Sequence, residues 1–187
     1  MGTATRRRSA VTLGVPLDRD HVAAAAEAAA HAGLAPPSTA ACPHVTLLVL
    51  LELPPGPGVD DAVGRVAART APFAVRARNL GVFDDGAGGL VLHVPVVRSE
   101  PLARLHHDLY AALTAAGATV DGYHAPDSWF PHVTLGDRLG PADLVAAVAA
   151  LAARPAITWT LPVTELVRMD PSGETTVVPL GGARPGP

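Results

Sequence analysis

"PHVTL" occurs twice in this chain, at Pro43–Leu47 and at Pro131–Leu135. Each copy lies in an apolar run that is too short for a surface helix and is typical of a buried strand. Successive side chains of a strand point to opposite faces, so the histidine and threonine of each copy share one face and the valine and leucine share the other. Each copy therefore predicts a strand with one core face and one polar face. The four polar residues are His44, Thr46, His132 and Thr134.

The remainder of the chain alternates apolar runs with helical segments. The run Val11–Leu17 precedes an alanine-rich segment that ends near His31, with Asp18 or Asp20 as a helix cap and Gly33 as a terminator. The same signals predict strands over 44–53, 73–83, 89–97, 131–137, 156–169 and 175–181, a hairpin turn at 84–89, and helices over 59–70, 101–117 and 141–154.

The order of these elements indicates a duplicated fold. Strand, helix, motif strand and helix follow one another in the first half, and the second half partly repeats this order. The two motifs are too far apart for a solenoid repeat. We therefore predict an α+β, bilobal, duplicated fold. It forms a single domain over residues 1–187, with an ordered core over about 11–180 and two pseudo-symmetric lobes.

The composition disfavours several classes of protein. A formal net charge of −3 gives no basic field for long duplexes, and no apolar run reaches the roughly 20 residues of a membrane helix. The single cysteine, Cys42, cannot form an internal disulfide or a thiolate metal site. Arginines at 6–8 precede apolar residues as in an export signal, but charges at 18–20 interrupt that stretch and favour a first strand instead. We expect a cytoplasmic monomer with no membrane segment.

The polar faces of the two motif strands suit phosphodiester chemistry if they meet in one cleft. Imidazole has an unperturbed pKa near 6.5, so one histidine can accept a proton while the other donates one to the leaving oxygen. Threonine hydroxyls two residues further along can bind the non-bridging phosphate oxygens. This division of labour needs no metal and no other cofactor. The symmetry of the motifs leaves open which histidine is the acid and which is the base.

The two H-x-T motifs on apolar strands resemble those of the two-histidine (2H) phosphoesterase superfamily, most of all its bacterial 2′-5′ RNA ligase and cyclic phosphodiesterase branch. The similarity covers about residues 11–180. It implies two antiparallel sheets flanked by helices around a central cleft, metal-independent chemistry, and 2′,3′-cyclic phosphate ends or 2′-5′ linkages as substrates. By motif position, His44 and His132 inherit the catalytic roles, and Thr46 and Thr134 the phosphate-binding roles.

Other residues near the motifs are weaker candidates. Members of that branch often carry an arginine at the position of Asp137, whereas this chain has Arg138 one residue later. Trp129, just before the second motif, can stack on a nucleobase. His93 is expected to be structural or exposed, and so is His124, with the cleft rim as an alternative.

Three functions stay open at this level. The first is hydrolysis of 2′,3′-cyclic phosphates of a small nucleotide or an RNA terminus. The second is cleavage or ligation of 2′-5′ linkages, or opening of another small cyclic phosphate. The third is a nucleotide-binding module without turnover, which the retention of both histidines and both threonines disfavours because binding alone needs no pair of proton-transfer groups.

Overall fold

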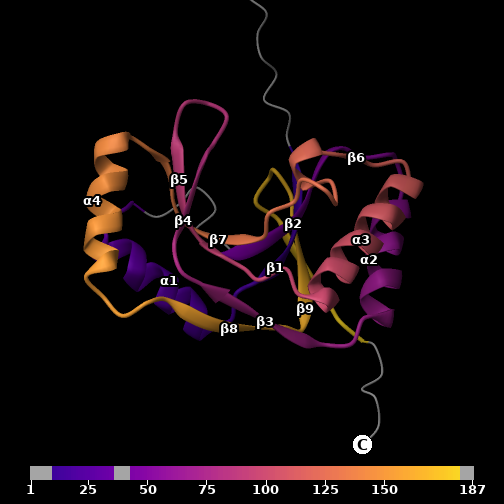
Figure 1. The fold of residues 1–187 in the computed structure, drawn as a ribbon. Helices are drawn as coiled ribbons and strands as arrows, with labels where there is room; N and C mark the ends of the chain where they lie inside the picture. Colours follow the sequence, from indigo (N-terminus) through magenta and orange to yellow (C-terminus); the bar gives the residue numbers. More distant parts are fainter. Residues whose placement is uncertain (1–9, 36–42, 182–187) are drawn as a thin grey trace, which may run out of the picture.

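A computed structural model describes residues 10–35 and 43–181, which hold two groups of strands flanked by helices (Figure 1). Cys42 lies outside these residues. The elements are β1 Val11–Pro16, α1 Arg19–His31, β2 His44–Glu52, α2 Gly58–Arg69, β3 Phe73–Arg78, β4 Gly81–Asp84, β5 Leu90–Pro95, α3 Glu100–Ala115, β6 Thr119–Val120, a 3-10 turn η1 Gly122–His124, β7 His132–Leu139, α4 Pro141–Ala152, β8 Thr158–Val163, β9 Glu165–Met169 and β10 Thr175–Pro179.

The first motif lies in a five-stranded antiparallel sheet with the strand order β10-β9-β1-β2-β6. β1 pairs along β2 from His44 to Leu50, whereas the short β6 pairs only with Leu50 and Glu52, beyond the motif. The register puts Val15 opposite Val45, and it shifts by a bulge between Leu13 and Gly14. The His44 ring lies so close to Gly14 that a Cβ there would come within 2.9 Å of it. A glycine is therefore needed opposite the first motif.

The second motif lies at the edge of a smaller sheet. β7 pairs with β5, and β5 pairs with β4, in the order β4-β5-β7, while β3 and β8 form a two-stranded sheet. A bridge between Ala77 and Val96 joins these two sheets, and the Val97 N–H donates to the Arg76 carbonyl at 2.7 Å. The sheet β4-β5-β7 and the sheet β3-β8, joined in this way, can be counted as one. The fold then has the two antiparallel sheets that the family resemblance implies.

Two predicted strands are each divided in the structure. The run 73–83 becomes β3 and β4, because Asn79 adopts a φ of 68° that bends the chain from one sheet into the next. The run 156–169 becomes β8 and β9, which pair with β3 and β1 respectively. Apolar periodicity continues through both bends and so gives no sign of them. The hairpin at 84–89 is confirmed by the pairing of β4 with β5.

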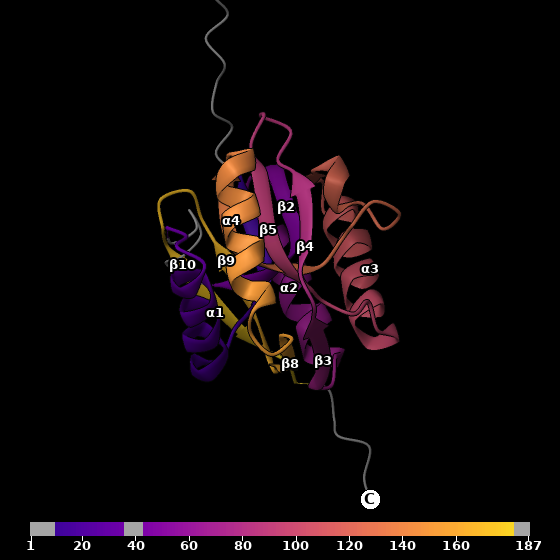
Figure 2. The same cartoon turned by 60° about the vertical axis from the view of Figure 1, so that its left-hand side comes forward.

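The helices cover the two sheets in a crossed arrangement. α1 contacts β7 and α4, and α4 contacts β5, so these two helices lie against the sheet of the second motif (Figure 1). α2 and α3 contact each other, and they contact β10 and β2 respectively, on the other side of the molecule (Figure 1). In the turned view, α4 and α3 stand to either side of β5 and β4 (Figure 2). As predicted, Asp18 caps α1 by accepting from the His21 N–H at 2.9 Å.

The apolar faces of both motifs belong to the core, as their period-two pattern predicts. Val45 and Leu47 are 2% and 0% exposed, and Val133 and Leu135 are each 1% exposed. Full burial of such a side chain contributes roughly 1.5–3 kcal/mol, so each motif strand is held from its back face. Within residues 10–35 and 43–181, no helix is long and apolar enough to cross a membrane.

Candidate active site

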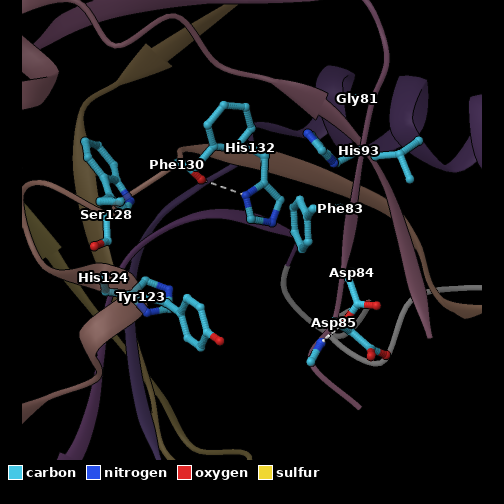
Figure 3. A pocket seen from close by; sticks show the side chains of 13 residues that line it. Gly81, Phe83, Asp84, Asp85, His93, Tyr123, His124, Ser128, Phe130 and His132 are labelled. Atoms are coloured by element: carbon cyan, nitrogen blue, oxygen red, sulfur yellow. Dashed lines mark hydrogen bonds between the residues drawn. The ribbon is translucent and has the colours of Figure 1, made fainter. Parts of the chain in front are cut away.

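The second motif stands beside a cavity of about 630 Å³. β7 brings His132 to its wall, and pairing with β5 puts Thr134 opposite His93. Figure 3 shows His132 near the centre, between residues of β4 and residues of the segment 121–130. The side chains that shape the cavity here are those of Phe83, His93, Tyr123, His124, Phe130 and His132.

The His132 ring has a fixed tautomer. Its Nδ1 lies 2.8 Å from the Phe130 carbonyl oxygen, and since a carbonyl can only accept, Nδ1 carries the proton and donates (Figure 3). In the neutral ring, the Nε2 lone pair is then left for a substrate. Burial lowers the pKa of His132, and the bond to Phe130 offsets part of that shift. His132 is therefore set up to accept a proton at neutral pH.

Aromatic rings hold His132 in place. Its ring centroid lies 4.9 Å from that of Phe83 and 5.1 Å from that of His93, both with edge-on geometry. Phe130 stacks at 6.4 Å from His132 and also contacts His93 at 5.5 Å. These contacts leave the His132 side chain little freedom to turn away from the cavity.

His93, expected from the sequence to be structural or exposed, is a buried member of this cluster. It is 2% exposed, and neither ring nitrogen has a hydrogen-bond partner among the described residues. Burial lowers the pKa of His93 to about 4, with a further lowering by the charge of His132 and an offset by the backbone of Val91. The ring is therefore neutral near pH 7. A lone histidine in an apolar strand carries no signal that could have identified it.

Gly81 makes room for His93, and this leads to a stability prediction. A Cβ at Gly81 would lie within van der Waals radii of the His93 ring, including an approach to its Cε1 of 2.8 Å. We expect Gly81→Ala to lower the free energy of unfolding by about 1–3 kcal/mol, as overpacking does in closed sites. Chemical denaturation measures this loss.

The control for Gly81→Ala is Gly64→Ala in α2. A Cβ at Gly64 meets nothing within 4 Å. Alanine is favoured over glycine in a helix by roughly 0.5–1 kcal/mol, so this variant is expected to keep or gain stability. Equal stability of the Gly81→Ala protein and the parent would show that the β4–β5 pair can open to admit a methyl group.

The first motif is arranged differently from the second. His44 is 8% exposed, and its Nε2 lies 3.1 Å from the Thr46 hydroxyl oxygen, so the two polar groups of this motif bond to each other. Among the four motif residues, His132 lines the cavity, and His44, Thr46 and Thr134 are not in its wall. The free protein thus presents the two histidines in unequal surroundings, which their identical sequences do not predict.

Trp129 connects the two motifs. Its indole N–H donates to the Thr46 carbonyl oxygen at 2.9 Å, across 83 positions of the chain. One ring face stacks on His106 at 3.9 Å with an interplanar angle of 7°, and Arg98 lies 5.7 Å from the ring centroid. Trp129 is only 4% exposed. Trp129 also borders the cavity. These contacts give the residue a structural role, and its stacking on a nucleobase stays a prediction.

The exposed aromatic side chains of the cavity are Tyr123 and Phe130, at 79% and 53% exposure. Both lie in the loop that leads to the second motif, and an aromatic residue in such a loop is a signal that the sequence did offer. On the opposite side, Asp84 and Asp85 accept backbone N–H groups of their own turn at 2.6 Å and 2.8 Å. The backbone N–H groups of Ala87 and Gly89 lower the pKa of Asp85, so this carboxyl stays ionised.

Comparison with known proteins agrees with this arrangement. The family model of the 2′-5′ RNA ligase superfamily matches residues 17–174, which include both motifs. This chain belongs to the 2′-5′ RNA ligase superfamily. An RNA 2′,3′-cyclic phosphodiesterase of Geobacillus stearothermophilus is 29% identical over 126 residues, which are 66% of this chain and 38% of the relative. The aligned part thus spans well under half of that relative's length.

Solved structures share the fold with this superfamily member. The crystal structure of TT0787 of Thermus thermophilus matches with a TM-score of 0.65 and 27% identity, over 94% of this chain and 100% of that one. Escherichia coli LigT, crystallised with 3′-AMP, matches with a TM-score of 0.59 and 17% identity, over 92% of this chain and 94% of its own. The second likeness concerns the fold alone.

Within the part of the chain that the structure describes, this 2′-5′ RNA ligase superfamily member has no arginine at the cavity wall after its second motif. Arg138 is 74% exposed on its side chain, has a φ of 55°, and lies 3.8 Å from Asp137. It is not in the cavity wall. Among residues 10–35 and 43–181, no group of three His, Cys, Asp or Glu side chains is placed so that it could hold a metal ion.

Two buried histidines are expected to make the protein less stable to unfolding at acid pH. Burial lowers the pKa of both His93 and His106 to about 4, from 6.5. As the pH falls, these histidines take up protons in the unfolded chain at a higher pH than in the folded protein. Their full contribution to the free energy of unfolding is therefore present above pH 6.5, and it is lost as the pH drops toward 4. Lowering the pH from about 7 to about 5.5 should cost about 1 kcal/mol for each histidine. Urea unfolding at the two pH values measures the loss.

A variant separates His93 from the other groups that titrate. His93→Phe keeps a ring of similar shape and removes the titration, so the part of the acid-induced loss that His93 contributes, about 1 kcal/mol, should disappear. An unchanged dependence on pH in this variant would mean that His93 takes up its proton in the folded state as easily as in the unfolded one.

Proposed function

We propose that this chain is an enzyme that hydrolyses 2′,3′-cyclic phosphates of nucleotides or RNA ends without a metal or another cofactor. The observation that carries the proposal is the position of His132, on the cavity wall with Nδ1 bonded and Nε2 left for a substrate. Membership of the superfamily and the similarity to a named RNA 2′,3′-cyclic phosphodiesterase support it.

In this proposal His44 and His132 exchange protons with the substrate, and Thr46 and Thr134 bind phosphate oxygens. One imidazole takes a proton from the attacking water, and the other gives one to the ribose oxygen that leaves the phosphorus. In the free protein the Thr46 hydroxyl occupies the His44 Nε2. A substrate oxygen must therefore displace or join that hydroxyl when the cyclic phosphate binds.

The cavity suits a nucleotide of limited size. Its volume of about 630 Å³ lies within the range of roughly 300–1,000 Å³ typical of small-molecule sites. The exposed rings of Tyr123 and Phe130 can stack on a base, a contact worth roughly 1–3 kcal/mol. We therefore place the base against these two residues instead of Trp129.

The decisive experiment is turnover of 2′,3′-cyclic nucleotides by the purified full chain in excess chelator, with products separated by chromatography. We expect hydrolysis to a single nucleoside monophosphate. His44→Ala should reduce kcat by about 10²-fold or more, the lower range for loss of a general acid or base. Equal kcat values for His44→Ala and the parent would remove the first motif from the mechanism.

Product analysis also separates the other functions. Cleavage or joining of 2′-5′-linked dinucleotides, with cyclic nucleotides left intact, would favour the activity for which the superfamily is named. Tight binding of cyclic nucleotides in a calorimeter without any product would favour a binding module.

The proposal includes a monomer in a reducing cytoplasm, acting on small nucleotides or RNA termini and not on long duplexes. The net charge of −3 supports the last point. Light scattering of the purified chain tests the monomer, since a mass near twice 19.0 kDa would contradict it.

A further inference from the structure

A third imidazole, that of His124, stands across the cavity from His132. Both residues line the cavity. In Figure 3 the two rings lie on facing sides of the opening, with Tyr123 beside His124. His124 belongs to no H-x-T motif, and none of the roles assigned above uses it.

The backbone of His124 is fixed on several sides. Its N–H donates to the Asp121 carbonyl at 2.9 Å, and the Asp121 side chain caps the same turn by accepting from the Tyr123 N–H at 2.9 Å. Its carbonyl oxygen lies 3.0 Å from Nε2 of His106, which is 0% exposed and therefore donates from a fixed position. The turn is thus anchored to the core below it.

The same segment is tied to the first motif strand at both ends. The Asp121 N–H donates to the Val49 carbonyl at 2.8 Å, and the Trp129 indole donates to the Thr46 carbonyl at 2.9 Å. The segment that carries His124 is therefore held against β2 while it faces β7. This arrangement places a histidine between the two motifs.

The His124 ring is not satisfied within the protein. Its Nδ1 is buried and has no hydrogen-bond partner among the described residues. A buried polar atom without a partner costs about 1–3 kcal/mol. The other ring nitrogen, Nε2, is not among these buried atoms and accepts or donates no bond within the described residues, so it is the nitrogen that a ligand in the cavity can reach.

An anionic ligand would change the protonation of His124. Burial lowers the pKa of His124, the carboxylate of Asp121 raises it, and the charge of His132 lowers it. The other ionisable side chains of the cavity wall are those of Asp84, Asp85, His93 and Tyr123. An anion between His124 and His132 would stabilise a proton on either ring, because opposite charge favours the charged form.

We propose that His124 is a substrate-binding residue whose imidazole contacts a non-bridging oxygen of the phosphate on which His132 acts. This inference rests on the proposed function, and it adds a third histidine to the two that the motifs contain. The contact is a charge-assisted hydrogen bond from a ring N–H to the phosphate, with no covalent step.

Kinetics of His124→Ala test this contact, because alanine has no side-chain donor. Loss of one hydrogen bond to a charged group lowers kcat/KM for 2′,3′-cyclic nucleotides by about 10- to 100-fold. The matched control is His107→Ala, which removes an exposed histidine of α3 and should leave kcat/KM unchanged. Unchanged kcat/KM in a folded His124→Ala protein would overturn the proposal.

A binding experiment keeps the inference separate from the proposed function. Inorganic phosphate is titrated into the full chain while the imidazole resonances are followed by NMR at several pH values. We expect phosphate to raise the apparent pKa of His124 together with that of His132, and to raise that of His124 also in the His132→Ala protein. This result without any turnover would reject the enzymatic function and retain the phosphate site. A His124 resonance that does not respond to saturating phosphate would reject the site, whatever the turnover.

Discussion

His132→Ala is expected to lower kcat for a 2′,3′-cyclic nucleotide by about 10³-fold, within the range of about 10²–10⁴ for loss of a positioned acid or base. The reason is geometric. His132 lines the cavity, donates from Nδ1 to the Phe130 carbonyl at 2.8 Å, and leaves Nε2 for the substrate. Single-turnover measurements with excess enzyme report the loss without interference from product release.

The control for His132→Ala is His31→Ala, which removes an exposed histidine at the end of α1. It should match the parent in kcat and in thermal unfolding. The pH profile gives a second criterion. Because burial lowers the pKa of His132, the acidic limb of kcat/KM should fall below pH 6.5 if this ring acts as the base, and it should be absent in His132→Ala. Full activity of His132→Ala would leave the cavity without a catalytic role.

The second large effect is expected for Trp129→Ala. The indole is 4% exposed, stacks on His106 and donates to the carbonyl of Thr46. Truncation of a buried aromatic side chain costs roughly 3–5 kcal/mol, because contacts are lost and a cavity remains. Denaturant titration should show this loss in the free energy of unfolding.

Trp129→Phe divides the effect of Trp129→Ala into two parts. It keeps a ring against His106 and removes the N–H, which leaves the Thr46 carbonyl without its donor. A cost of about 1–3 kcal/mol is expected for this step, less than for the alanine variant. If both variants were as stable as the parent, the loop before the second motif would contribute nothing to holding β2 and β7 together.

The local pattern of the motifs was enough to predict their faces. Valine and leucine of each copy are buried, as period-two alternation requires, and the helix caps at Asp18 and Gly33 are where residue chemistry places them. Such features depend on neighbours in the chain. They are therefore readable without knowing the fold.

Features that depend on distant contacts could not be predicted in the same way. The bend at Asn79 is required by pairing of β3 with β8, about eighty positions away, and apolar spacing is the same with or without it. The different surroundings of the His44 and His132 rings likewise arise from the residues that lie next to each strand in the folded protein. Gly14 and Thr46 adjoin the first ring, whereas Phe83, His93 and Phe130 surround the second.

The crossed packing of α1 has a consequence for synthesis on the ribosome. This helix follows the first strand, but its partners β7 and α4 are made about a hundred residues later. The face of α1 that is buried in the folded protein therefore stays exposed to solvent through most of translation. That surface consists of Ala25, Ala28 and Ala29, whose small methyl groups offer little for other nascent chains to adhere to. The alanine content of α1 thus suits a helix that is synthesised early and packs against its partners only after they have been made.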